Sequence, residues 1–108
     1  MATPLEIDVE TLDRMRKSGE PHALLDVREG WELDICAVDG ATHIPLNQLP
    51  QRVGELPTDR PVVVICHHGG RSAQAMMFLR QRGLPQAINL EGGIDAWARR
   101  IDPAMKVY

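Results

Sequence analysis

The chain has 108 residues, of which 44% are hydrophobic and 25% are charged, a balance typical of a globular protein with one hydrophobic core. The net charge of -3 makes nucleic acids and anionic membranes unfavourable partners. Two cysteines are too few for a disulfide framework, and no apolar stretch has the length of a membrane span. The first ten residues contain acidic side chains and lack the apolar core of a signal peptide. We therefore expect one domain, residues 1–108, in the reducing cytoplasm.

The first half of the chain alternates short apolar runs with amphipathic segments. The predicted elements, in chain order, are a strand at Leu5–Ile7, a helix at Val9–Lys17, a strand at Ala23–Val27, a helix at Glu29–Ile35, a strand at Thr42–Ile44 and a helical turn at Asn47–Val53. Asn47 is the expected N-cap of that turn, because its side-chain oxygen can accept a hydrogen bond from a free backbone N–H group.

The second half begins with the most apolar predicted strand, Val62–Ile65. It is a run of four β-branched residues, and such an unbroken run indicates a central strand buried on both faces. The remaining elements, in chain order, are a turn at Cys66–Gly70, a helix from Arg71 or Ser72 to Arg82, a buried strand at Ala87–Leu90 and a helix at Ile94–Arg100. Strands that alternate with helices predict an α/β fold with a largely parallel sheet.

Cys66 directly follows the predicted central strand, and in such sheets ligands bind beyond the carboxyl ends of the strands. A thiol is a good nucleophile only when it is deprotonated, and an ordinary cysteine is about 3% thiolate at neutral pH. Here Gly69 and Gly70 let the turn curl around an anion, and Arg71 adds a permanent charge at the helix start. No acidic residue occurs between Arg60 and Leu90, so no carboxylate nearby in sequence opposes that charge. We expect Cys66 to be an activated thiolate.

The same hollow can hold a persulfide sulfur, a departing sulfite or a phosphate oxygen. The residues alone therefore leave sulfur transfer and phosphate monoester hydrolysis open, and the spacing of four residues between Cys66 and Arg71 has to separate them. His67 and His68 are expected at the rim of the pocket, where an imidazole can donate to an anion or shuttle a proton. They are not expected to bind a metal with Cys66, because three adjacent residues cannot easily direct three side chains at one ion.

Four motifs, in the same order along the chain, resemble those of rhodanese-family sulfurtransferases. They are LLDVREGWEL at 24–33, DGATHIPL at 39–46, CHHGGRS at 66–72 and INLEGGIDAW at 88–97. Any one of them alone is weak, but together they span the chain from about Ala23 to Trp97. The resemblance implies an α/β fold with a doubly wound, five-stranded, mainly parallel sheet and helices on both faces.

The resemblance also implies a mechanism. Cys66 would take a sulfane sulfur from a small anionic donor such as thiosulfate, hold it as a persulfide and pass it to a thiol or protein acceptor, without a cofactor. The expected substrate-binding residues follow it along the loop: His67, His68, Gly69, Gly70, Arg71 and Ser72. Asp26 and Arg28 are expected to tie loops together by ion pairing, or alternatively to contact the substrate.

Two alternatives stay open beside this hypothesis. A phosphatase or an arsenate reductase-like enzyme can use the same loop, although the related cell-cycle phosphatases have a loop one residue longer. A non-catalytic rhodanese-like module that binds partners would not need Cys66. The chain also departs from the family at Cys36, Ala37 and Val38, where family members usually read G-H-I. Cys36 is expected to be a structural substitution rather than a resolving cysteine.

Overall fold

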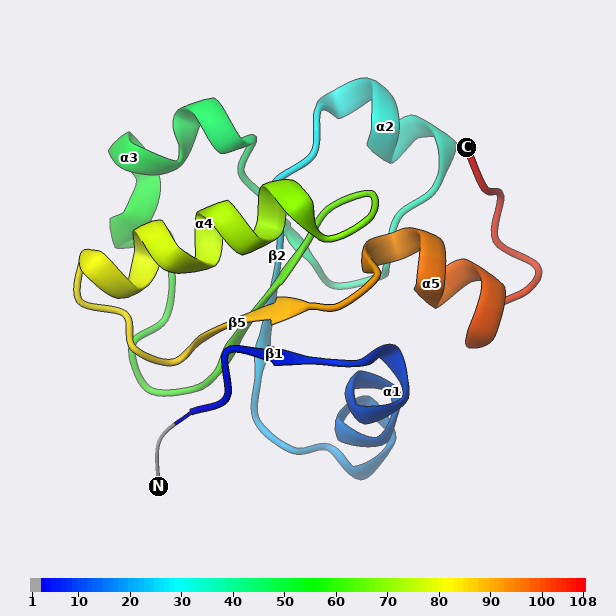
Figure 1. Cartoon of the computed structure of the whole chain (residues 1–108), viewed down its shortest axis with the longest axis horizontal. Helices are drawn as coiled ribbons and strands as arrows, with labels where there is room; N and C mark the ends of the chain where they lie inside the picture. Colours follow the sequence, from blue (N-terminus) through cyan, green and yellow to red (C-terminus); the bar gives the residue numbers. More distant parts are fainter. Residues whose placement is uncertain (1–2) are drawn as a thin grey trace.

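The computed structural model describes residues 3–108, which form a sheet with helices on both faces (Figure 1). The strands are β1 (Glu6–Ile7), β2 (Ala23–Asp26), β3 (Thr42–His43), β4 (Val62–Ile65) and β5 (Ala87–Leu90). The helices are α1 (Val9–Ser18), α2 (Gly30–Ile35), α3 (Leu49–Arg52), α4 (Gly70–Gln81) and α5 (Gly93–Arg100), and 3₁₀ turns at Leu46–Gln48 and Val53–Glu55 flank α3. Within residues 3–108, no helix is long and apolar enough to cross a membrane.

In this described part of the chain, the strand order is β1-β5-β4-β2-β3 and every neighbouring pair is parallel. After β2 the chain moves to β3 on one side, whereas after β4 it moves through α4 to β5 on the other side. The carboxyl ends of β2 and β4 therefore border the switch point of a doubly wound fold, where ligands bind. The predicted five-stranded, parallel α/β architecture is confirmed.

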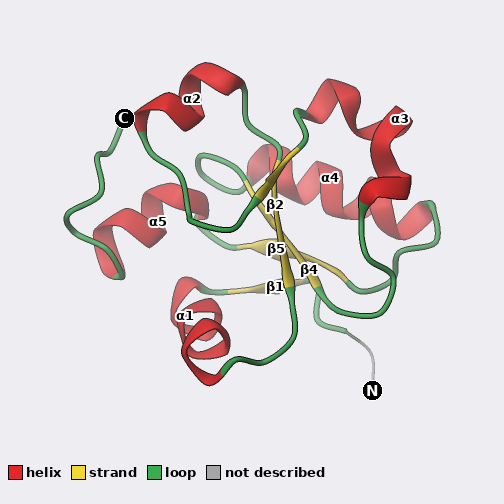
Figure 2. Cartoon of the chain, turned by 180° about the vertical axis from the view of Figure 1, so that it is seen from behind, coloured by secondary structure: helices red, strands yellow, loops and turns green. Residues whose placement is uncertain are grey.

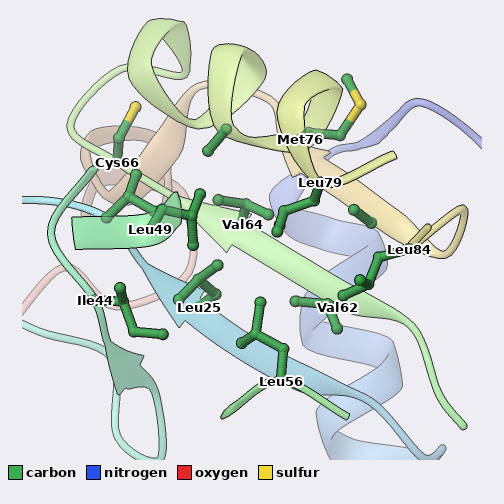
Figure 3. Close-up of a cluster of buried hydrophobic side chains, with 13 residues drawn as sticks. Leu25, Ile44, Leu49, Leu56, Val62, Val64, Cys66, Met76, Leu79 and Leu84 are labelled. Carbon is green, nitrogen blue, oxygen red and sulfur yellow. The ribbon is translucent and has the colours of Figure 1, made fainter. Parts of the chain in front are cut away.

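Alternation along β4 determines which helices its side chains meet. Val62 and Val64 pack in one core with residues of α3 and α4, whereas Val63 and Ile65 pack in a second core with residues of α1 and α5. Figure 2 shows these two pairs of helices on opposite faces of the sheet. Cys66 belongs to the first core and continues the Val62 and Val64 side of the strand, so its side chain points toward α4 (Figure 3).

One predicted helix start is wrong. Asn47 is not an N-cap but lies inside the 3₁₀ turn Leu46–Gln48, whose N-cap is Pro45. The backbone N–H of Leu46 donates to the carbonyl of Val27 at 3.1 Å, and that of Gln48 donates to Pro45 at 2.8 Å. The turn is therefore fixed to the end of β2 by a backbone hydrogen bond, without a polar cap.

Candidate active site

Cys66 lies at the carboxyl end of β4 and is only 1% exposed (Figure 3). Its Sγ is 3.0 Å from the backbone nitrogen of Gly69, which donates to it, and 3.2 Å from the hydroxyl oxygen of Ser72. Both neighbours come from the same short segment, because the turn after β4 brings the start of α4 over the end of the strand. The sulfur is buried beneath hydrogen-bond donors, which favour a negative charge on it.

The start of α4 makes this end of the site electropositive. Gly69 adopts a φ of 110°, a conformation that favours glycine, and α4 begins at Gly70, one residue before the predicted range. The N–H of Ala73 donates to the carbonyl of Gly69 at 3.1 Å. This bond is the first one within the helix, so the N–H groups of residues 70–72 have no acceptor inside the helix. Such groups carry a partial positive charge at the start of a helix.

The first residues of α5 donate hydrogen bonds to the backbone of the reactive turn, residues 66–70. The N–H of Ile94 donates to the carbonyl of Cys66 at 2.8 Å, and that of Asp95 donates to the carbonyl of His67 at 3.1 Å. Gly93 permits this approach, because it has a φ of 61° and a Cβ there would collide with both carbonyl groups. The start of α5 therefore holds the backbone of the reactive turn in place.

The hydroxyl of Ser72 lies between Cys66 and Asn89. Its oxygen is 3.2 Å from Sγ and 2.5 Å from Oδ1 of Asn89. A hydroxyl carries one proton, so it can donate to only one of these acceptors at a time. With a neutral thiol it can donate to Asn89 and accept from the S–H group, and with a thiolate it can turn to the sulfur. The sequence analysis missed Asn89, although a polar residue in the buried strand β5 is a usable signal.

Arg71 is paired with Glu32 of α2. Nη1 and Nη2 of Arg71 donate to Oε2 and Oε1 of Glu32 at 2.8 and 2.7 Å, and the backbone N–H of Glu29 donates to Oε2 at 2.8 Å. The bidentate contact lowers the pKa of Glu32 from 4.5 to about 2 and raises the pKa of Arg71. The sequence analysis missed this partner because Glu32 lies 39 residues from Arg71. A carboxylate distant in sequence therefore balances the charge of Arg71.

Asp26 and Arg28 form a second ion pair, sealed in the interior. Nη2 of Arg28 is 2.7 Å from Oδ2 of Asp26, and the side chains are 0% and 1% exposed. The other N–H groups of Arg28 donate to Asp26, to the carbonyls of Glu32 and Cys36, and to the hydroxyl of Tyr108. Although burial opposes it, hydrogen bonding to Asp26 raises the pKa of Arg28. Because all five N–H donors are used internally, the geometry favours the structural role over substrate contact.

His67 and His68 lie side by side at the rim of the turn but differ in their surroundings. Nε2 of His67 is 2.7 Å from the main-chain oxygen of Tyr108, and the two rings stack with centroids 3.8 Å apart. His68 is exposed, and its ring centroid lies 3.9 Å from that of His67. Neither the sequence motifs nor the composition pointed to Tyr108, which contacts the site from the other end of the chain.

His67, His68 and Asp95 bring potential metal-ligating atoms within 4.8 Å of one another. The two imidazole rings are tilted by 32°, and Nε2 of His67 is already engaged by the main-chain oxygen of Tyr108 at 2.7 Å. Asp95 is also engaged by Nε of Arg99 at 3.1 Å. The arrangement does not fit a preformed metal site, and the absence of a metal stays a prediction.

Comparison with known proteins places this site in a family. The family model described as a Rhodanese-like domain matches residues 8–100. A sulfurtransferase of Allochromatium vinosum is 40% identical over 94 residues, which cover 87% of this chain and 88% of that protein. The probable adenylyltransferase/sulfurtransferase MoeZ of Mycobacterium tuberculosis is 42% identical over 93 residues, which cover 84% of this chain but only 24% of that protein.

Similarity in structure leads to the same family. The crystal structure of a rhodanese-related protein from Thermoplasma volcanium matches with a TM-score of 0.82 and 35% sequence identity, and the match covers 91% of this chain and 94% of that one. The residues matched by the family model include Cys66, the turn after it and the Glu32–Arg71 pair. This chain therefore belongs to the Rhodanese-like domain family, which includes its sulfurtransferase relatives.

Proposed function

We propose that this chain is a sulfurtransferase that carries a sulfane sulfur as a persulfide on Cys66. The observation that supports the proposal best is the position of Sγ, buried at the start of α4 next to the N–H of Gly69 and the hydroxyl of Ser72. Such donors stabilise a negative charge on the thiolate and on a second sulfur bound to it. The relatives named as sulfurtransferases support the same activity.

The proposed reaction has two halves. In the first, the Cys66 thiolate attacks the sulfane sulfur of thiosulfate, an S–S bond forms, and sulfite leaves with the electron pair of the bond that breaks. The outer sulfur of the persulfide then carries the negative charge. In the second half, an acceptor thiolate attacks the outer sulfur, and the electron pair of the broken bond returns to Cys66. The protein alternates between two covalent states, which predicts ping-pong kinetics without a cofactor.

The Glu32–Arg71 pair argues against phosphate chemistry on the same turn. An arginine that binds a phosphate typically presents two parallel N–H groups to its oxygens. Nη1 and Nη2 of Arg71 are both directed to the carboxylate of Glu32 instead. Together with the short spacing between Cys66 and Arg71, this favours sulfur transfer over hydrolysis of phosphate monoesters. A purely partner-binding module would not require a buried thiol surrounded by donors.

The surroundings of Cys66 also suggest the kind of donor and compartment. A cysteine that is only 1% exposed suits a small donor, and the electropositive helix start suits an anion such as thiosulfate. The acceptor is a second thiol, either a small molecule or a protein cysteine. Cys36 and Cys66 are both free, and a reducing compartment such as the cytoplasm keeps them so.

Mass spectrometry tests the proposal directly. Protein treated with thiosulfate should gain the mass of one sulfur atom, and cyanide or a reductant should remove it. Cys66→Ser should abolish the gain. Cys36→Ser, the matched control at the other buried cysteine, should keep at least about half of the activity because one sulfane sulfur needs one carrier thiol. Thiosulfate–cyanide activity that survives Cys66→Ser would overturn the proposal, as would robust hydrolysis of aryl phosphates.

A further inference from the structure

The last residues of the chain return to the reactive turn. The family model matches only as far as residue 100, whereas residues 101–108 run from α5 toward α2 (Figures 1 and 2). A turn in which the N–H of Met105 donates to the carbonyl of Asp102 lies within this segment. Tyr108 thereby contacts side chains of α2 and of the turn after Cys66. This segment adds contacts to the site that the matched region does not contain.

The ring and main chain of Tyr108 hold His67. The two rings are nearly parallel, with planes 3° apart and centroids 3.8 Å apart, and Nε2 of His67 is 2.7 Å from the main-chain oxygen of Tyr108. Because that oxygen can only accept, the contact requires a proton on Nε2. Trp31, which is 61% exposed, meets the ring of Tyr108 edge-on with centroids 6.1 Å apart. Tyr108 therefore fixes both the position of His67 and one of its protons.

The hydroxyl of Tyr108 joins the two ion pairs of the site. It accepts from Nη1 of Arg28 at 3.0 Å and donates to Oε1 of Glu32 at 3.0 Å. The chemistry fixes these directions, because a guanidinium can only donate and an ionised carboxylate can only accept. The same Oε1 accepts from Nη2 of Arg71 at 2.7 Å. Tyr108 thus acts on the oxygen that holds Arg71 at the start of α4.

We infer that Tyr108 is a positioning residue of this site: its hydroxyl holds Glu32, and through it Arg71, while its ring holds His67 at the rim. The effect of Tyr108 on the rate rests on the proposed function. The docking of Tyr108, meaning its contacts with Arg28, Glu32 and His67, does not. His67 is occupied at Nε2 and on one ring face. The exposed His68 is therefore the rim imidazole that is free to meet a sulfur donor or acceptor.

The environment of the phenol supports this geometry. Burial raises the pKa of Tyr108, the contact with Arg28 lowers it, and the bond to Glu32 raises it, so that the net direction is upward from 10.0. The phenol accordingly stays neutral at neutral pH and keeps the proton that it donates to Glu32. A phenolate at this position would place two negative charges next to each other.

Single-turnover persulfide formation with thiosulfate tests the role in three variants. Tyr108→Phe removes only the hydroxyl, and Tyr108→Ala removes the ring as well. Val107→Ala is the matched control at the neighbouring residue, which is 48% exposed. We expect formation about fivefold slower in Tyr108→Phe, about tenfold slower or more in Tyr108→Ala, and unchanged in Val107→Ala. Thermal unfolding identifies any loss of fold, which is least expected for Tyr108→Phe because that change deletes one oxygen atom.

A double-mutant cycle separates positioning from a general loss of stability. If Tyr108 acts through Glu32, the Tyr108→Phe change should reduce the rate little further in a Glu32→Gln background. Rate losses that multiply independently would overturn the inference, as would a Tyr108→Phe rate equal to that of the wild type.

The docking itself can be measured without any activity, because Tyr108 is the single tyrosine of the chain. In Cys66→Ser, the ultraviolet absorbance of the phenolate should report a pKa of Tyr108 above 10.0. A value at or below 10.0 would contradict a buried hydroxyl that donates to Glu32 and would overturn the inference. If the wild type forms no persulfide, the proposed function is wrong, but the titration still tests the contacts of Tyr108. A wild type that forms persulfide no faster than Tyr108→Phe would sink only the positioning role.

Discussion

The two ion pairs next to the reactive turn have the same chemistry and different surroundings. In Asp26–Arg28 the side chains are 1% and 0% exposed, whereas in Glu32–Arg71 they are 3% and 37% exposed. Both pairs have a closest N–O distance of 2.7 Å. The first pair lies inside the protein at the end of β2, and the second places an arginine partly in solvent at the start of α4. Distance alone therefore does not tell what an ion pair does.

Burial determines what each pair contributes to stability. Moving a charge out of water costs several kcal/mol, which is offset only by a close partner and by full hydrogen bonding. Arg28 meets both conditions, since each of its N–H groups has an acceptor. Arg71 is partly solvated, so water can replace a lost partner there. We therefore expect Asp26–Arg28, the sealed pair, to determine the stability of the fold. We expect Glu32–Arg71, the half-open pair, to determine the reactivity of Cys66.

Breaking the sealed pair should have the largest effect. Asp26→Asn keeps the shape of the side chain but leaves the charge of Arg28 buried without a counter-charge. The free energy of unfolding should fall by about 3–5 kcal/mol, which urea denaturation at neutral pH can measure. A loss below about 1 kcal/mol would mean that the hydrogen bonds of Arg28 suffice without the charge of Asp26, and the contrast between the two pairs would disappear.

Breaking the half-open pair should affect the thiol more than the fold. Arg71→Ala removes a positive charge that interacts with Cys66 and leaves Glu32 without its counter-charge, so we expect the thiolate to be disfavoured. Alkylation of Cys66 by iodoacetamide at neutral pH should slow by about tenfold, with Cys36→Ser as the background that isolates one thiol.

The partner residue provides the control for this prediction. Adding Glu32→Gln to Arg71→Ala removes both charges and should restore most of the alkylation rate. If the double variant is as slow as Arg71→Ala or slower, then Glu32 does not act on Cys66 through its charge.

Acid should weaken the half-open pair in a defined pH range. Arg71 lowers the pKa of Glu32 from 4.5 to about 2, so the stabilisation is present above pH 4.5 and is lost as the pH falls through about 2. Because Arg71 is partly exposed, we expect a contribution on the order of 1 kcal/mol. The difference in unfolding free energy between wild type and Glu32→Gln should shrink over this range. A difference that stays constant down to pH 2 would contradict the assignment.

Separation along the sequence explains which parts of the site were predictable. The buried run of β4 places Cys66 at its carboxyl end, and Gly69 and the start of α4 follow within a few residues, so periodicity and turn chemistry suffice. Glu32, by contrast, lies 39 residues from its partner Arg71. Tyr108 lies 76 residues from its partner Glu32. Nothing in the neighbourhood of either residue indicates its partner, because only the packing of α2 and the last residues against the turn brings them together.

The fold shows the same division. The strands and most helices follow from hydrophobic periodicity, whereas the 3₁₀ turn at Leu46–Gln48 depends on a backbone hydrogen bond to Val27 at the end of β2. Asn47 has the side chain of an N-cap, but that contact from a neighbouring strand determines the local geometry instead. A capping signal is therefore overridden where a segment is held by the sheet.

A third ion pair, Arg52–Glu55, should have the smallest effect and sharpen the contrast. Its Nε–Oε2 distance is 2.8 Å, about as short as in the site, but the side chains are 33% and 50% exposed. Water and salt screen such a contact, and ordering two long side chains opposes the attraction. Arg52→Ala should therefore leave the urea midpoint unchanged, although the contact lowers the pKa of Glu55. The test compares the urea midpoints of Arg52→Ala and Asp26→Asn with that of the wild type in the same buffer. Equal shifts in the two variants would mean that N–O distance, rather than burial, decides what an ion pair contributes in this protein.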